Sequence, residues 1–169
     1  YALPLVQQLW EKSAENGLNI ISLSTAFEDF ELNTLENTQL LVKEKKIIGE
    51  TKKALAQYGF EKYPDRLNFP VLMDDFISRE EFLTDEKLDE IVNANSAFAG
   101  LNEIRRSELK REIRRYLSHY EKIPYTFTVN NFAGTPTWVL FDENLEILTQ
   151  WFGHKSAEET EWIIKSVTK

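Results

Sequence analysis

The sequence predicts an α/β sandwich with a mixed sheet and a helical insertion. Residues 3–24 run through a helix, a glycine turn and a short apolar strand, which is the second half of a βαβ unit. Residues 137–152 predict an antiparallel hairpin, and a capped helix follows it. Parallel structure therefore comes first and antiparallel structure last, with one strand fewer at the N-terminal side than a complete sandwich needs.

The first helix is predicted over Leu3–Glu15. Leu5 and Leu9 stand four residues apart on one apolar stripe, and Gly17 is a typical residue for a helix end. Residues 18–24 are β-branched, apolar or small. This composition predicts a strand whose two faces are both covered, as in a parallel sheet.

The next region predicts two helices and a short extended segment. Residues 34–57 have helical character, and Gly49 divides them because glycine weakens a helix interior. Gly59 is expected to end the second of these helices. Residues 68–74 are expected to be extended and to end at an acidic turn.

Residues 78–122 predict a helical insertion. Ser78 and Glu81 have the spacing of a capping box, and apolar residues then recur at helical intervals along two stripes. Because the composition does not change at either end, we expect an insertion within a single domain that spans residues 1–169.

The remainder of the chain predicts β structure and a last helix. Apolar residues alternate with threonines over residues 125–129, which favours a strand. Residues 137–141 and 145–152 form the hairpin strands, in which the tryptophans are expected to pack across the pair. Ser156 is predicted to cap the final helix, and Trp162, Ile163 and Val167 are expected on one side of it.

Composition narrows the functional classes. Lys and Arg total 20 against 28 Asp and Glu, a net charge of −8, which argues against a nucleic-acid partner. No apolar run approaches the roughly 20 residues that span a bilayer. The sequence contains no cysteine, so disulfides, zinc–thiolate sites and cysteine nucleophiles are excluded within these residues. No metal site is predicted.

Three segments together resemble the thioredoxin-fold proteins of the TlpA and redoxin type. The stretch Phe132–Asp142 resembles the G-x-P-T segment, hydrophobic strand and acidic turn of that family. Residues 17–21 resemble its G-L-x-(I/V)-I strand, which follows a helix that carries a proline, here Pro4. Residues 69–74 resemble its F-P-V-L-x-D stretch. The order of these motifs is the family's order, and they cover most of the chain outside the insertion.

The resemblance implies a thioredoxin-like α/β/α sandwich and a thiol–disulfide oxidoreductase that acts on protein disulfides or dithiols. It implies a cis Thr135-Pro136 bond and a substrate-binding role for Gly134, Thr135 and Pro136, with no dissociable cofactor. The family's C-x-x-C pair precedes the helix proline, so these cysteines are expected just upstream of Tyr1. No catalytic residue is assigned within the chain, and Ala2 stands where relatives often carry a glutamate.

The family's first strand is central in its sheet and would also lie upstream. Without it, a gap with unpaired backbone groups is expected between the strands of this chain. Relatives of the TlpA branch are often extracytoplasmic, so the resemblance implies a periplasmic location. The oligomeric state is left open.

Two other functions stay open. One is a thioredoxin-like binding module without redox activity, in which the turn at Pro136 still binds peptides. The other is a thiol peroxidase of the peroxiredoxin kind, for which the visible residues offer no P-x-x-x-(T/S)-x-x-C context.

The two histidines and one basic cluster are further candidates for a functional role. His119 and His154 lack metal-ligand spacing and are expected to be ordinary, with His154 the better candidate because it follows a strand end. A basic cluster over residues 105–115 is interleaved with glutamates at helical spacing. It predicts a solvated helix, with docking of an acidic partner as a minor alternative.

Overall fold

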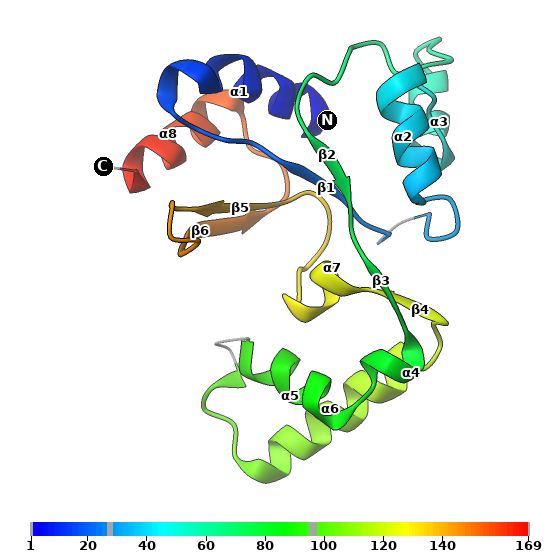
Figure 1. The fold of residues 1–169 in the computed structure, drawn as a ribbon, viewed down its shortest axis with the longest axis vertical. Coiled ribbons are helices and arrows are strands. Elements are labelled where there is room, and N and C mark those ends of the chain that lie inside the picture. Colours follow the sequence, from blue (N-terminus) through cyan, green and yellow to red (C-terminus); the bar gives the residue numbers. More distant parts are fainter. Residues whose placement is uncertain (1, 27–28, 95–97, 169) are drawn as a thin grey trace. The chain divides into compact units, whose positions relative to one another are not determined.

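The structure is a computed structural model that describes residues 2–26, 29–94 and 98–168. It is a mixed α/β protein, as the sequence predicted (Figure 1). The chain divides into two compact units. The first joins Tyr1–Met73 to Ala133–Lys169, and the second is Asp74–Phe132.

The first unit holds two separate two-stranded sheets and four helices among its described residues. Its elements are α1 (Ala2–Asn16), β1 (Ser22–Ser24), α2 (Leu35–Glu44), α3 (Gly49–Ala56), β2 (Val71–Met73), β5 (Thr137–Phe141), β6 (Ile147–Phe152) and α8 (Ala157–Val167). β1 and β2 are parallel, whereas β5 and β6 are antiparallel, with a bulge at Leu140/Phe141. The predicted helices and hairpin are therefore confirmed. The parallel pair and the hairpin do not join into one mixed sheet, because no described strand lies between them in the ladder.

β1 differs from its prediction. The strand has three residues rather than the seven expected, and Leu23 is 42% exposed instead of covered on both sides. The reason lies in its pairing, since among the described residues β1 has a single strand neighbour, β2, where Leu23 is paired with Leu72. A sequence pattern records how apolar a strand is, but not how many neighbours cover it.

A buried cluster holds the first unit together. Its fully packed members are Val6, Ile47, Tyr63, Leu67 and Phe69. Leu3 of α1 and Trp138 of β5 are partly buried and pack against this cluster. The start of α1 and the start of the hairpin thus share one core.

α8 begins as the sequence predicted but presents a different face. Ser156 and Glu159 form a reciprocal capping box. Thr160 is 1% exposed, whereas Trp162 is 70% exposed, so the expected grouping of Trp162 with Ile163 and Val167 is wrong. Two residues turn an α-helix by about 200°, which carries Trp162 away from the face centred on Thr160.

The second unit is wider than the predicted insertion and has its own core. Its elements are β3 (Phe76–Ser78), α4 (Arg79–Phe82), α5 (Asp85–Ala94), α6 (Glu103–Leu117), β4 (Lys122–Pro124) and α7 (Tyr125–Val129). β3 and β4 pair antiparallel and bring together the two ends of residues 78–122. The core residues are Phe82, Leu88, Ile91, Leu117 and Ile123. Ser78 caps α4 as predicted, since its hydroxyl accepts a hydrogen bond from the Glu81 N–H at 3.1 Å.

The strand expected over residues 125–129 is wrong, because this segment is the helix α7. Asp74, which is 3% exposed, accepts hydrogen bonds from the N–H groups of Thr126 and Phe127 at 2.9 and 3.1 Å. Those groups open the helix, where an acidic partner is favourable. Tyr125 and Val129 stand four residues apart and both pack on the second core. Apolar residues that alternate every second position also recur every fourth position. The pattern over residues 125–129 therefore fits a helix as well as a strand.

Within the residues that the structure describes, no helix combines the length and apolar character needed to cross a bilayer.

Candidate functional site

The turn that precedes β5 is fixed at both of its ends. The Thr135-Pro136 peptide bond is cis, as the sequence predicted. On one side the Thr137 hydroxyl donates to the Gly134 carbonyl at 2.6 Å. On the other the Gly153 N–H donates to the Pro136 carbonyl at 2.9 Å. These two bonds hold the backbone on either side of Thr135.

Gly134 is buried against an aromatic ring. A Cβ atom at this position would lie 2.7 Å from Cε2 of Phe152, which is closer than real side chains approach. Any larger residue therefore requires the Phe152 ring to move. This contact gives a physical reason for glycine at a position that the sequence singled out through its motif alone.

Thr135 is the exposed member of the turn. Across the described residues, its backbone N–H and C=O have no hydrogen-bond partner. A backbone donor and acceptor that are both free at a surface can pair with an extended peptide as an added strand. The structure thus brings the predicted site residues Gly134, Thr135 and Pro136 into one turn with one free pairing position.

Two stacked tryptophans support the turn. Trp138 and Trp151 face each other across the hairpin, with ring centroids 5.7 Å apart and planes 7° apart. This confirms the predicted cross-strand packing. The Trp138 indole N–H also donates to the Gly153 carbonyl at 3.2 Å. Gly153 is therefore hydrogen-bonded both to Pro136 in the turn and to Trp138 of β5, the strand that follows the turn.

The first turn of α1 approaches the residues just beyond Gly153. A cavity of about 410 Å³ is lined by Pro4, Leu5, Gln8, His154, Lys155 and Ala157. His154 thus lies with Pro4 at one cavity, two residues that the sequence had noted separately. The first turns of α1 therefore line the same cavity as His154.

α1 is also joined to α8 by an ion pair. Lys12 on α1 contacts the Glu161 carboxylate on α8. The hydrogen bond to Glu161 raises the pKa of Lys12, and the same bond lowers the pKa of Glu161. The pair is exposed to solvent, so it orients the two helices more than it stabilises them.

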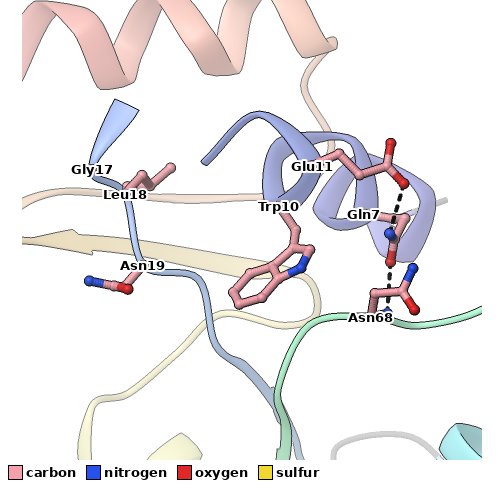
Figure 2. Close-up of a pocket in the computed structure, with 7 residues that line it drawn as sticks. All are labelled: Gln7, Trp10, Glu11, Gly17, Leu18, Asn19 and Asn68. Carbon is pink, nitrogen blue, oxygen red and sulfur yellow. Dashed lines mark hydrogen bonds between the residues drawn. The ribbon is translucent and has the colours of Figure 1, made fainter. Parts of the chain in front are cut away.

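A larger cavity of about 550 Å³ lies beside α1 (Figure 2). It is lined by Gln7, Trp10, Glu11, Gly17, Leu18, Asn19 and Asn68. The Gln7 side chain donates to Glu11 and accepts from the Asn68 N–H, both at 2.9 Å. The sequence does not predict this cavity. The signal that it offers is Gln7, a polar residue among the apolar residues Leu5, Val6 and Leu9 of the predicted helix.

The two histidines lie in different units, His119 in the second and His154 in the first. No group of three or more histidines and carboxylates is arranged to hold a metal ion in the described ranges. The sequence contains no cysteine, so the turn at Thr135 carries no thiol.

Comparison with known proteins returned no match to any family model, curated protein or solved structure.

Proposed function

We propose that this chain is the larger, C-terminal part of a thioredoxin-like domain that acts as a thiol–disulfide oxidoreductase on protein disulfides or dithiols. The observation that carries the proposal is the turn at the exposed residue Thr135, whose backbone N–H and C=O are unpaired within the described residues while both flanks are fixed. Such a turn holds a substrate chain in register beside a reactive group.

The arrangement of the first unit supports the finer fold. A parallel pair, an antiparallel hairpin and two helices joined by Lys12 and Glu161 are elements of a thioredoxin-like sandwich. β1 and β5 each have one strand neighbour among the described residues. In the proposed domain a central strand from upstream of Tyr1 lies between them and completes the sheet.

The proposed chemistry uses a cysteine pair supplied upstream of Tyr1, at the N-terminal end of α1. The thiolate of the first cysteine attacks one sulfur of the substrate disulfide, and the other substrate sulfur leaves as a thiolate that takes up a proton. The second cysteine, as a thiolate, then attacks the mixed disulfide and releases the first substrate sulfur. The substrate disulfide is reduced and the cysteine pair is oxidised. The role of this chain is to lower the thiol pKa through α1 and to hold the substrate through Thr135.

The first experiment is the intact mass of the protein from its native source, before and after reduction and thiol alkylation. A mass above 19.8 kDa with two alkylated thiols supports the oxidoreductase. A mass of 19.8 kDa with no thiol overturns it.

The second experiment separates backbone pairing from side-chain contacts at Thr135. Thr135→Pro removes the N–H, whereas Thr135→Ala keeps it. We expect Thr135→Pro to weaken binding of an extended disulfide-containing peptide by roughly fivefold to tenfold, the value of one hydrogen bond, with Thr135→Ala nearly unchanged. Circular dichroism spectra that match the wild type would show that both variants fold. Equal losses in the two variants would contradict pairing through the main chain.

A peptide-binding module without redox activity is the second candidate. The specific observation in its favour is that the 169 residues contain no cysteine. It predicts the same difference between the two Thr135 variants but no disulfide reduction by the intact protein. The mass and alkylation experiment therefore distinguishes the two functions.

A further inference from the structure

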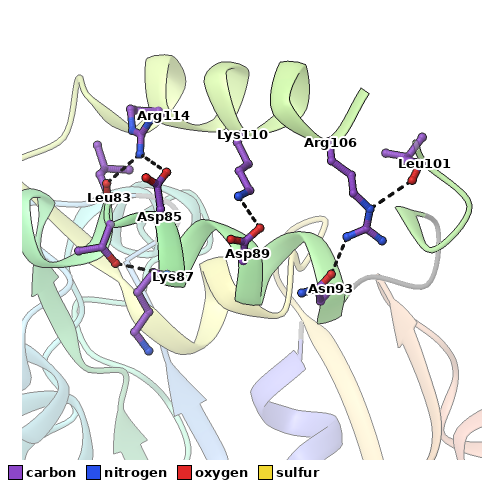
Figure 3. A network of polar contacts seen from close by, with 10 residues as sticks. Leu83, Asp85, Lys87, Asp89, Asn93, Leu101, Arg106, Lys110 and Arg114 are labelled. Carbon is purple, nitrogen blue, oxygen red and sulfur yellow. Dashed lines mark hydrogen bonds and ion pairs between the residues drawn. The ribbon is translucent and has the colours of Figure 1, made fainter. Parts of the chain in front are cut away.

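Five of the six cations of α6 fall into two sets with different surroundings. Three of them, spaced four residues apart, reach across to three residues of α5 with the same spacing (Figure 3). The pairs are Arg106 with Asn93, Lys110 with Asp89, and Arg114 with Asp85. Residues four apart share one helix face, so this ladder uses the face of α6 that is turned towards α5.

The ladder bonds are specific rather than diffuse. Arg106 donates to the Asn93 side chain at 2.6 Å and to the Leu101 carbonyl at 3.2 Å. Arg114 donates to Asp85 at 3.0 Å and to the Leu83 carbonyl at 3.3 Å. These cations therefore hold the helix pair together, which gives them a structural role that the sequence pattern did not reveal.

Arg111 and Arg115 form a second row on α6. They are also four residues apart. Each directly follows a ladder residue in the sequence and is therefore turned by about 100° around the helix axis from it. Both are exposed. In the part of the chain that the structure describes, neither guanidinium has an ion pair or hydrogen bond. Arg105, by contrast, is paired with Glu108 at 2.8 Å.

Apolar and aromatic groups accompany the second row. Tyr116 is 65% exposed and its ring packs beside that of Tyr120, with centroids 5.8 Å apart. Ile104 stands seven residues before Arg111, about two helical turns, on the same side of α6, and it is 72% exposed. Charges flanked by exposed aromatic and aliphatic side chains are typical of protein-binding surfaces.

We propose that Arg111 and Arg115, here called the outer row, form a docking surface for an acidic polypeptide segment. The Cβ atoms of the two arginines stand one helical turn apart, about 6 Å. Carboxylates two residues apart on an extended segment are separated by about 6.6 Å, so one such pair matches the two arginines. Each arginine can then bind one carboxylate through two N–H groups.

The same surface fits a polypeptide better than a nucleic acid. Glu112 lies between the two arginines and repels a continuous phosphate backbone, whereas isolated carboxylates can be placed on either side of it. The net charge of −8 adds long-range repulsion against a polyanion.

The test is a titration of the full chain with a short peptide that alternates glutamate and leucine, followed by amide chemical shifts. Arg111→Glu combined with Arg115→Glu is compared with Lys43→Glu combined with Lys52→Glu, which makes the same change in net charge on exposed helices of the first unit. We expect the peptide to shift α6 amides, the arginine variant to bind roughly tenfold more weakly, and the lysine variant to bind as the wild type does. Added salt should also weaken binding.

Three outcomes would overturn the proposal. The first is no binding of the acidic peptide to the wild type. The second is an equal loss in the lysine variant, which would make the effect one of net charge. The third is tighter binding of a single-stranded oligonucleotide than of the peptide. Thermal unfolding of the arginine variant, compared with the wild type, shows whether the helix pair is intact, because its ladder residues are unchanged.

Discussion

The buried carboxylate of Asp74 accepts a 2.9 Å hydrogen bond from the main-chain N–H of Thr126. A second bond from Phe127 follows at 3.1 Å, so one side chain satisfies two N–H groups at the start of α7. Because Asp74 is 3% exposed, those groups have no easy access to water as a substitute.

We therefore expect Asp74→Ala to lower the free energy of unfolding by about 2 kcal/mol, because two N–H groups at the start of α7 lose a buried charged acceptor. Asp75→Ala is the matched control. Its carboxylate bonds only to the adjacent Phe76 N–H among the described residues, and it is exposed, so the cost should be well below 1 kcal/mol. Urea unfolding measures both values. Equal costs would mean that α7 does not depend on this contact.

Asp74 also marks where sequence reasoning failed. Helices with clear stripes and caps, such as α1 and α8, were predicted because their signals are local. α7 was predicted as a strand because its deciding contact comes from a residue some fifty positions earlier. The exposed position of Trp162 was missed for a related reason, since the buried face of α8 is set by what it packs against and not by its most apolar residue.

The features of the candidate site also divide into those that a local motif predicts and those that only the folded chain creates. Gly134, Thr135 and Pro136 were found through a motif, and the structure brings them into one turn. The contact of Phe152 with Gly134 and the cavity beside Gln7 depend on segments that meet only in the folded chain. No local pattern encodes them. The pairing of Arg114 with Asp85 was hidden likewise, because the sequence showed only glutamates at helical spacing as partners.

The free energy of unfolding at high pH should depend on the ionisation of the Tyr63 hydroxyl. Its hydroxyl is buried without a hydrogen-bond partner in the described structure, and burial, assisted by the charge of Asp65, raises the pKa of Tyr63 from 10.0 to about 12. Below pH 10 the hydroxyl is protonated in both folded and unfolded chains. Above it the unfolded chain releases the proton first, so stability falls as the pH rises towards 12.

We expect the wild type to lose about 2 kcal/mol more than Tyr63→Phe between these two pH values, measured by urea unfolding at each pH. Tyr58→Phe, at a tyrosine that is 70% exposed, should follow the wild-type curve. At neutral pH, Tyr63→Phe should be neutral or stabilising, because it removes an unpaired polar atom from the core. Parallel curves for the wild type and Tyr63→Phe would contradict the raised pKa.

Gly49 meets two constraints that substitution can separate. Its φ is +51°, and a Cβ atom would lie 2.0 Å from Asp29 Oδ2, which accepts the Glu50 N–H at 2.7 Å. We expect Gly49→Ala to cost at least about 2 kcal/mol, from left-handed strain together with displacement of the cap. Gly59→Ala shares a positive φ, +79°, with open space around it, and should cost about 1 kcal/mol.

In an Asp29→Ala background the clash is absent. The further cost of Gly49→Ala should then fall to about 1 kcal/mol, the strain alone. Thermal or urea unfolding of the four variants in this cycle measures the coupling. Full additivity of the two substitutions would show that Asp29 does not constrain Gly49.

Gln7 links α1 to the entry of β2, and its neighbour provides a control. The Gln7 side chain is 9% exposed, and its carbonyl oxygen accepts the Asn68 N–H. Gln7→Leu keeps a similar volume but leaves that N–H without its acceptor, so we expect a loss of about 1–2 kcal/mol and faster hydrogen exchange at Asn68. Gln8→Leu makes the same chemical change at an exposed position and should stay within about 0.5 kcal/mol of the wild type. Unchanged exchange at Asn68 in Gln7→Leu would show that this bond does not hold the helix to the strand. Loss confined to Gln7→Leu would instead establish that a polar residue within the apolar stripe of α1 sets the position of the segment leading into β2.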